Sequence, residues 1–400
     1  MKILFRFIVL LLVLSACSAS ENQSDINSPV PVEIAEEAKT LVPVDTLSFE
    51  LDSLTSAKSW IFQFKLLNNK PYFIIANQAI NSLQAYNLLS EKLEKRIFFP
   101  KEGPNKISIY ENFYVHNWDS LFFLEANTNN VLLYDSTAQT INKWSLQFKE
   151  EHQGYTATTQ EYYFRPSYEE KTSSFGFWVY PSKSAFSSEF YTYAKAFDYN
   201  LSEGTYKVYG QYPPNYFNEK GTYIVHRPTN GYTTENHTIL HYTASSLIYL
   251  YDKNSKELLK VIDAKSKYLP DGVPPLMTQE PENKALLEER IEYYLTTGNY
   301  EYMFSNEDYS YHYRIVKHPG AFKDDSGKQK TNDEFTFSIM IFDKDFRLLN
   351  ELAFSPSIYD YRQSFAYQDK LYLCMNNPKN TSIGEDDLMF QVLQLIEAKE

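Results

Sequence analysis

Short apolar runs separated by polar turns fill the chain from residue 44 onward, a pattern typical of β-strands joined by tight hairpins. One combination recurs: an apolar run ends in an aromatic residue, usually followed by Asp or Asn, a polar turn and a strand that carries Lys or Arg. Five copies place the aromatic residue at Tyr86, Tyr134, Phe197, Tyr251 and Phe342, with spacings of 48, 63, 54 and 91 residues. A four-stranded propeller blade takes about 40–50 residues. The repeat therefore predicts propeller blades, some of them lengthened by insertions.

Each copy is interpreted as the third and fourth strands of one blade. The aromatic side chain would pack within the blade layer, and the Asp or Asn would open the hairpin by accepting hydrogen bonds from nearby backbone N–H groups. In four of the five copies, a proline follows soon after the fourth strand. It marks the crossing to the next blade, because proline cannot continue a strand ladder. The hairpin residues are Asn87, Asp135, Asp198, Asp252 and Asp343, and the prolines are Pro100, Pro213, Pro270 and Pro356.

The two ends of the repeat complement each other. Residues 388–396 predict a third strand without a fourth, and residues 44–52 predict an extra strand before the first blade. Pairing these segments would complete the last blade and close the ring, with Leu47, Phe49 and Leu51 on one side. We therefore predict an all-β fold, a six-bladed β-propeller whose last blade is closed by the N-terminal strand. Five or seven blades stay open, because residues 147–190 are difficult to assign to strands.

One inserted helix is predicted within residues 265–299. Glu280-Pro281-Glu282 suits a helix N-terminus, apolar residues follow at helical spacing from Leu286 to Leu295, and Gly298 ends the pattern. The helix would cover the propeller face or a blade edge. A lid or a partner-binding helix is the alternative.

The N-terminus has the features of an export signal. Lys2 and Arg6 precede an apolar run, Ile3 to Leu14, which is shorter than the roughly 20 residues of a membrane-spanning helix. The run ends in Leu14-Ser15-Ala16-Cys17, which resembles the bacterial lipobox, a motif whose cysteine is lipidated and becomes the mature N-terminus. We predict a signal peptide over residues 1–16, a lipid on Cys17, a flexible tether over residues 17–43, which are polar and Pro-containing, and a propeller domain over residues 44–400.

The motifs together resemble a known group of proteins. The lipobox at Cys17, the Tyr-Asp hairpins and the turn Phe99-Pro-Lys-Glu-Gly-Pro104 are similar to those of the six-bladed β-propeller lipoproteins of Bacteroidota, many of which are families of unknown function. The resemblance implies localisation in the cell envelope. Ser18, in place of Asp after the cysteine, favours by analogy the outer membrane, on either its periplasmic side or the cell surface. The resemblance transfers no catalytic residues.

The charge, cysteine and histidine content argues against several classes of binding and catalytic site. The 51 acidic residues outnumber the 38 basic ones, giving a net charge of −13, so no footprint for nucleic acid or anionic lipid is expected. Cys374 lies in an apolar strand and is predicted to be a buried, inert thiol. His237 and His241 would lie about 13 Å apart on one face of a strand, too far to share a metal ion. No cofactor and no metal site are predicted.

Long insertions indicate where a ligand would bind. They fall in loops 149–160, 181–189, 210–221, 265–299, 317–334 and 376–386, which a propeller places at one end of the ring. The candidate binding residues in or beside these loops are Arg227, Arg314, Lys317, His318, Tyr212, Tyr216 and Phe217. The competing interpretation is that the loops plug the channel and bury their own aromatic side chains.

The functional hypothesis is a membrane-tethered binding or scaffold propeller of the cell envelope. Its partner would be an envelope protein, a peptide or a glycan. The alternatives are an envelope hydrolase or lyase that acts on glycans or peptides, and a sensory subunit of an envelope complex. The sequence contains no recognisable nucleophile elbow, phosphate loop or cysteine-based metal motif, and catalytic residues stay unknown.

Overall fold

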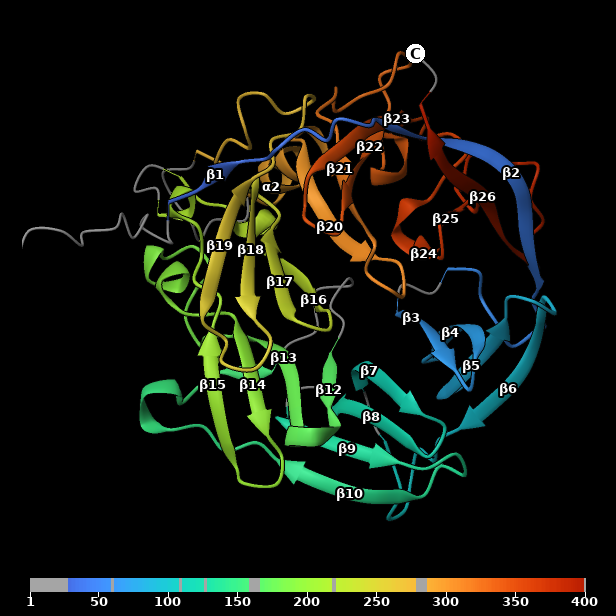
Figure 1. The fold of residues 1–400 in the computed structure, drawn as a ribbon, viewed down its shortest axis with the longest axis vertical. Helices are drawn as coiled ribbons and strands as arrows, with labels where there is room; N and C mark the ends of the chain where they lie inside the picture. Colours follow the sequence, from blue (N-terminus) through green and yellow to red (C-terminus); the bar gives the residue numbers. More distant parts are fainter. Residues whose placement is uncertain are drawn as a thin grey trace, which may run out of the picture.

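The computed structural model describes residues 28–58, 61–107, 110–125, 128–157, 166–217, 221–277 and 286–398. These residues form six sheets arranged around a central axis, as Figure 1 shows. The predicted six-bladed β-propeller is thereby confirmed. The signal segment 1–16, Cys17 and the predicted helix start at residues 280–282 lie outside the described residues.

The first five blades each take strands in chain order, from the innermost to the outermost position. Blade 1 contains β3 (Phe62–Leu67), β4 (Lys70–Asn77), β5 (Ser82–Asn87) and β6 (Lys92–Phe98). Blade 2 contains β7 (Tyr110–Asn117), β8 (Ser120–Glu125), β9 (Asn130–Tyr134) and β10 (Thr140–Ser145). In blade 3 the innermost position is shared by β11 (Thr156–Ala157) and β12 (Ser167–Glu169), followed by β13 (Ser174–Tyr180), β14 (Ala196–Asn200) and β15 (Thr205–Tyr209).

Blades 4 and 5 have the same layout. Blade 4 contains β16 (Thr229–Thr233), β17 (His237–Tyr242), β18 (Leu247–Asp252) and β19 (Leu258–Asp263). Blade 5 contains β20 (Asn299–Ser305), β21 (Tyr311–Lys317), β22 (Phe337–Asp343) and β23 (Leu348–Phe354). Blade 6 combines β24 (Phe365–Tyr367), β25 (Lys370–Cys374) and β26 (Asp387–Glu397) with β2 (Lys39–Glu50) from the other end of the chain.

The N-terminal strand closes the ring as predicted. β2 pairs with β26 in antiparallel register, with Leu47 opposite Phe390 and Phe49 opposite Leu388. Leu47, Phe49 and Leu51 are buried, whereas Glu50 between them is exposed. The strand begins at Lys39, five residues earlier than the predicted Val44. No described blade therefore ends in an unpaired third strand.

The prediction of a flexible tether over residues 17–43 is wrong from residue 28 onward, because residues 28–38 contact the blades and β2 begins at Lys39. Residues 28–38 form a belt along the outside of blades 4 and 5, visible in Figure 1 as the dark-blue segment from β1 (Val30–Pro31) to β2. β1 pairs in parallel with β19, Val32 N donates to Asp263 O at 3.0 Å, and Leu348 N donates to Glu33 O at 2.7 Å. The belt satisfies backbone groups on outer strands. Composition gives no sign of this, because backbone hydrogen bonds do not depend on side-chain polarity.

The core lies between the sheets, and the repeated aromatic residues fill it. Tyr86, Tyr134, Phe197 and Phe342 have no exposed surface, and Tyr251 has 6%. Cys374 is also buried, as predicted, and burial raises the pKa of its thiol far above the ordinary value. A buried, protonated thiol is a packing group and not a nucleophile.

The two ends of the ring differ in construction. The hairpin face is formed by the turns between first and second strands and between third and fourth strands. The insertion face is formed by the remaining loops, which contain helix α2 (Leu286–Thr296) and short 3₁₀ helices: η1 (Glu150–His152), η3 (Ser188–Thr192), η4 (Pro214–Tyr216), η5 (Ile224–His226), η6 (Asn332–Glu334) and η7 (Tyr361–Gln363). A further 3₁₀ turn, η2 (Glu170–Thr172), lies on the hairpin face. The predicted helix is confirmed over α2, and its Tyr293 ring lies 5.0 Å from the ring of His226 in η5.

Candidate functional site

Two of the predicted binding residues on the insertion face are fully buried cations. The guanidinium of Arg314 on β21 donates to the carbonyls of Ser245 at 2.6 Å and Ser246 at 2.7 Å. It therefore joins blade 5 to blade 4. The Lys317 ammonium donates to Tyr294 O of α2 at 2.5 Å and to Asn332 Oδ1 at 3.3 Å, and burial lowers the pKa of Lys317 to about 8. Both side chains hold the molecule together.

The predicted aromatic contacts are also mostly internal. Tyr212 and Tyr216 are buried, and their hydroxyls donate to the carbonyls of Arg227 and His226 at 2.9 and 2.6 Å. His318 is 9% exposed and stacks on Tyr268 at 3.9 Å. Tyr212 and Tyr216 are therefore not surface contacts for a partner, because their rings supply the core of a long insertion, as the competing interpretation expects. Phe217, 44% exposed, and the half-buried Arg227 keep surface at which a partner could bind.

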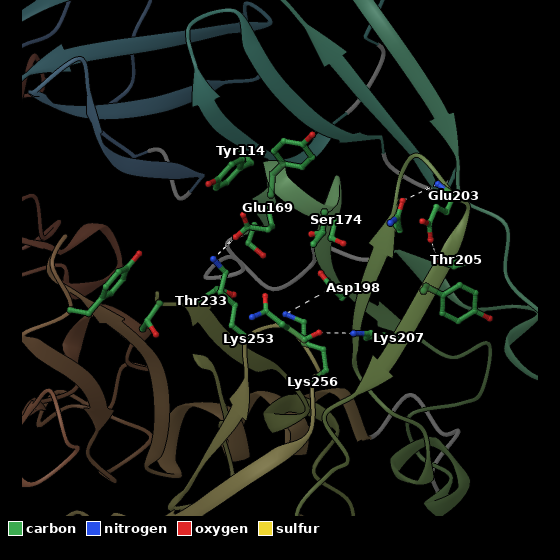
Figure 2. A pocket seen from close by; sticks show the side chains of 18 residues that line it. Tyr114, Glu169, Ser174, Asp198, Glu203, Thr205, Lys207, Thr233, Lys253 and Lys256 are labelled. Atoms are coloured by element: carbon green, nitrogen blue, oxygen red, sulfur yellow. Dashed lines mark hydrogen bonds and ion pairs between the residues drawn. The ribbon is translucent and has the colours of Figure 1, made fainter. Parts of the chain in front are cut away.

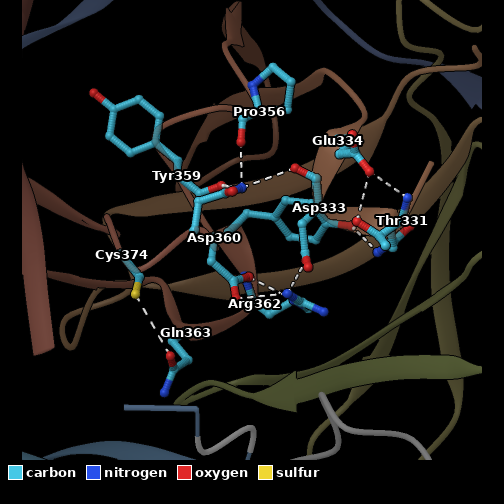
Figure 3. A network of polar contacts seen from close by, with 12 residues as sticks. Thr331, Asp333, Glu334, Pro356, Tyr359, Asp360, Arg362, Gln363 and Cys374 are labelled. Atoms are coloured by element: carbon cyan, nitrogen blue, oxygen red, sulfur yellow. Dashed lines mark hydrogen bonds and ion pairs between the residues drawn. The ribbon is translucent and has the colours of Figure 1, made fainter. Parts of the chain in front are cut away.

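A charged network fixes the loops of this face between blades 5 and 6. Figure 3 shows the Arg362 guanidinium between two carboxylates. It donates to Asp360 from Nε at 2.7 Å and forms an ion pair with Asp333. The Asn377 amide donates to the carbonyls of Asp333 at 3.0 Å, Tyr359 at 2.9 Å and Pro356. These polar groups therefore anchor the loops to one another.

The buried His226 predicts an acid-sensitive fold. Burial lowers the pKa of His226 to about 3, whereas the unfolded chain binds the proton with an ordinary histidine pKa of about 6.5. The stability from the neutral ring is present above pH 6.5 and is lost as the pH falls toward 3. Between pH 7 and pH 4 we expect the His226→Gln variant to lose about 3 kcal/mol less unfolding free energy than the wild type, measured by urea denaturation. Equal losses in both proteins would contradict the assignment.

A cleft opens on the hairpin face, at the seam between blades 3 and 4. It has a volume of about 590 Å³ and adjoins a second cavity of about 290 Å³ at the mouth of the central channel. Tyr114, Ser167, Thr233 and Tyr309 line both. We call the two together the seam cleft; Figure 2 shows its larger part. Its volume is within the range of about 300–1,000 Å³ that is usual for ligand sites.

The cleft arises because the repeat is shifted by two residues in blade 3. In blades 1 and 4 the hairpin residue accepts backbone hydrogen bonds: Leu89 N donates to Asn87 Oδ1, and Ser255 N donates to Asp252 Oδ1. Asp198 has no such role. β14 continues to Asn200, whose Oδ1 accepts from Ser202 N and Glu203 N. The predicted hairpin role of Asp198 is therefore wrong, and the repeated pair in blade 3 is Tyr199-Asn200.

This shift places Asp198 where other blades have an apolar residue. The positions preceding the repeated aromatic residue are Ala85, Leu133, Leu250 and Ile341. Their cross-strand partners on the second strand are large, namely Ile74, Phe122, Ile239 and Tyr313. In blade 3 the partner of Asp198 is Gly176, and the partner of Gly176 is Ser167. The small, polar row Ser167–Gly176–Asp198 replaces bulky packing and leaves the cleft open.

Glycine at position 176 leaves space between Ser167 and Asp198, which both line the cleft. A Cβ atom there would lie 2.5 Å from Ser167 Oγ and 3.8 Å from Asp198 Oδ1. Any larger side chain would occupy the space in front of the carboxylate. The open space between Ser167 and Asp198 therefore depends on glycine at position 176.

Charged groups from both blades meet in the cleft, as Figure 2 shows. Lys256 of blade 4 lies 3.8 Å from Asp198 and donates to Thr238 Oγ1 at 3.1 Å, and Lys253 forms an ion pair with Glu169. Burial raises the pKa of the Asp198 carboxyl, although Lys256 opposes the shift, and burial lowers the pKa of Lys256. By contrast, backbone N–H groups lower the pKa of the hairpin carboxyl of Asp252. Asp198 is thus a desolvated group whose carboxylate faces the cleft, whereas Asp252 serves its own turn.

No three His, Cys, Asp or Glu side chains gather as metal ligands anywhere in the part of the chain that the structure describes. Over the same residues, no helix is long and apolar enough to span a membrane.

The chain matches one known protein family over most of its length. A family model described as a domain of unknown function, DUF4221, matches residues 38–353, which include the closing strand β2 and blades 1–5 except the last residue of β23, Phe354. The chain belongs to the DUF4221 family. Together with the Bacteroides structures described next, this match confirms the resemblance to six-bladed propellers of unknown function from Bacteroidota. No curated protein matches this DUF4221 chain in a sequence comparison.

Two solved structures share the fold. A member of the DUF4221 family from Bacteroides vulgatus superposes with a TM-score of 0.75 at 18% identity, covering 91% of this DUF4221 chain and 100% of its own. A protein from Bacteroides fragilis, described as a "putative exported protein", superposes with a TM-score of 0.53 at 12% identity, covering 92% of this chain and 98% of its own. At these identities the likeness concerns the fold alone.

Proposed function

We propose that this DUF4221 protein is an exported, lipid-anchored protein of the cell envelope, whose propeller binds a ligand in the seam cleft. The observation that carries the binding part is the row Ser167–Gly176–Asp198. A desolvated carboxylate and a missing side chain in a blade layer reduce stability. Such a departure from the repeat is expected at a functional site and not in a purely structural layer.

The anchoring part is supported by the sequence Leu14-Ser15-Ala16-Cys17 after an apolar run. Residues 18–27 separate Cys17 from the first described residue, Ser28. Ten residues span at most about 35 Å when extended. The belt then fixes residues 28–38 to blades 4 and 5, so the propeller would be held close to the outer membrane by a tether shorter than the sequence alone predicted.

Substitution of Cys17 is expected to release the protein. The Cys17→Ala variant should lose incorporation of labelled fatty acid and either appear in the soluble envelope fraction or accumulate unprocessed, because several acyl chains are needed for stable attachment. Fractionation and intact mass measure both. Unchanged membrane retention and unchanged mass would contradict the anchor.

Ligand binding is tested with immobilised oligosaccharides and peptides, probed with processed, soluble Cys17→Ala protein, or with the chain from Ser18 onward where the variant stays unprocessed. Gly176→Ile places in blade 3 the side chain that blades 1 and 4 have at the same row position, Ile74 and Ile239. The new Cβ would lie 2.5 Å from Ser167 Oγ, so the Ser167 side chain must rotate away. We expect isoleucine to fill the cleft and abolish binding, while a cooperative thermal transition is retained. Phe217→Ala and Arg227→Ala are the matched variants on the insertion face. If these two variants lost binding and Gly176→Ile kept it, the ligand would bind on the insertion face and not in the seam cleft.

A further inference from the structure

The side chains that line the larger part of the seam cleft are all polar. Its eighteen lining residues comprise four tyrosines, six serines and threonines, two asparagines, three carboxylates and three lysines. A site for apolar peptide side chains would be lined mainly by aliphatic and aromatic carbon. The lining instead offers hydroxyl, amide and charged groups around the whole cavity, which suits a ligand that carries hydrogen-bonding groups on all sides.

The charges in this lining balance. Lys207, Lys253 and Lys256 face Glu169, Asp198 and Glu203. Two of the lysines are engaged inside the protein: Lys253 pairs with Glu169, and Lys207 Nζ donates to Asn254 O at 2.6 Å. A multiply charged ligand would therefore meet no complementary net charge. A neutral ligand with many donors and acceptors meets the requirement.

Asp198 supplies the acceptor that this ligand would need. Its carboxylate lies 3.8 Å from the Lys256 ammonium, longer than a hydrogen bond, and accepts no hydrogen bond among the contacts of the described residues. The relative exposure of its side chain is 15%, and that of Lys256 is 6%. A buried acceptor is stabilised strongly when a ligand provides donors, because charge-assisted hydrogen bonds are about twice as strong as neutral ones. Neighbouring hydroxyls of one ligand can satisfy Asp198 and Lys256 together, since a hydroxyl both donates and accepts.

Tyrosines extend the site toward the channel. Tyr114 and Tyr309 line both cavities, and Tyr309 has a left-handed backbone with φ of 59°. This conformation is unfavourable for a bulky residue, and the turn is fixed by Asn306, whose Oδ1 accepts from Tyr311 N and whose Nδ2 donates to Ser310 Oγ. Tyrosine presents an apolar ring together with a hydroxyl, which suits the alternating CH and OH surfaces of a sugar.

We propose that the seam cleft binds a neutral oligosaccharide, with Asp198 accepting hydrogen bonds from its hydroxyls and Lys256 donating to a neighbouring hydroxyl. This inference rests on the proposed function, since it assigns a ligand class to the same cleft. The two adjoining cavities make the site elongated, so more than one sugar unit is accommodated.

The test is a neutral and acidic oligosaccharide array together with a peptide array, probed with Cys17→Ala protein and its Asp198→Asn variant. Asparagine keeps the shape of the side chain and removes the charge. We expect neutral oligosaccharides to bind and Asp198→Asn to weaken binding by about 10- to 100-fold, the effect of losing charge-assisted hydrogen bonds. Asp135→Asn, in the hairpin of blade 2, is the matched control and should bind normally, because Asn87 performs the same hairpin role in blade 1.

The outcomes separate the two proposals. Binding of peptides alone, lost in Gly176→Ile, would overturn the oligosaccharide inference and keep the proposed function. A preference for acidic oligosaccharides, or equal affinity of Asp198→Asn and wild type, would also overturn the inference. Binding that Gly176→Ile leaves intact, or no binding on either array, would overturn the proposed function itself.

Discussion

Removal of residues 1–50 is expected to destroy the cooperative fold, whereas removal of residues 1–38 leaves a folded propeller. The first truncation deletes β2, which makes eleven residue pairs with β26 and supplies the outer strand of blade 6. Of the described residues, the second truncation deletes only the belt, residues 28–38. We expect soluble protein with a cooperative thermal transition from the second truncation, and aggregated protein or a transition without cooperativity from the first.

The size of the effect follows from what β2 buries. Phe49 has no exposed surface, and its ring lies 5.0 Å from that of Tyr86 in blade 1 and 6.1 Å from that of Phe390 in blade 6. It therefore joins the first blade to the last. Phe49→Ala alone should cost about 3–5 kcal/mol of unfolding free energy. The belt contributes backbone hydrogen bonds, each worth about 0.5–1.5 kcal/mol, and the partly buried side chains of Val32 and Ala35.

A matched pair of point variants checks this account. Val44→Ala changes an exposed side chain on the same strand, 52% exposed, and should leave stability unchanged within about 0.5 kcal/mol. Equal melting temperatures for the two truncations would show that ring closure does not depend on β2.

Replacing the Asp198–Lys256 ion pair with apolar side chains is expected to raise the stability of the protein and to abolish ligand binding. In Asp198→Leu/Lys256→Met, an apolar pair replaces a desolvated ion pair at a position where Leu133 and Leu250 occupy blades 2 and 4. Replacing a buried ion pair with apolar residues of similar volume often stabilises a protein by about 1–4 kcal/mol. We expect a gain of this size in urea denaturation, together with loss of ligand binding.

The single variants complete the comparison. Asp198→Leu alone leaves the Lys256 ammonium without its carboxylate, so it should be less stable than the double variant. A double variant that is less stable than the wild type would show that Asp198 and Lys256 hold blades 3 and 4 together, as a structural pair would.

Most of the fold could be predicted from the sequence because it depends on periodic signals. The apolar runs, the aromatic residues and the complementary end strands each report burial, and burial fixes the blades and their closure. The belt was not predictable in this way. It is held by backbone hydrogen bonds such as Val32 N to Asp263 O, which no side-chain pattern records.

The candidate site was harder to predict because two aromatic–polar pairs compete in Phe197-Asp198-Tyr199-Asn200. A shift of two residues keeps every side chain on the same face of the strand, so alternation cannot distinguish the pairs. The distinguishing signal is Gly204, four residues after Asn200, with φ of 70°. Glu91 and Lys256 have positive φ at the same distance from Asn87 and Asp252. Insertion length, in turn, pointed to the insertion face, where Tyr212, Tyr216 and Arg314 stabilise the loops themselves.

The most direct test of the seam cleft as the ligand site is hydrogen–deuterium exchange of the Cys17→Ala protein with and without the oligosaccharide that binds best on the array. The account predicts slowed exchange in residues 198–207 of blade 3 and 253–258 of blade 4, and unchanged exchange in residues 212–217 and 317–334. Protection confined to the second pair of segments, with blades 3 and 4 unaffected, would contradict it.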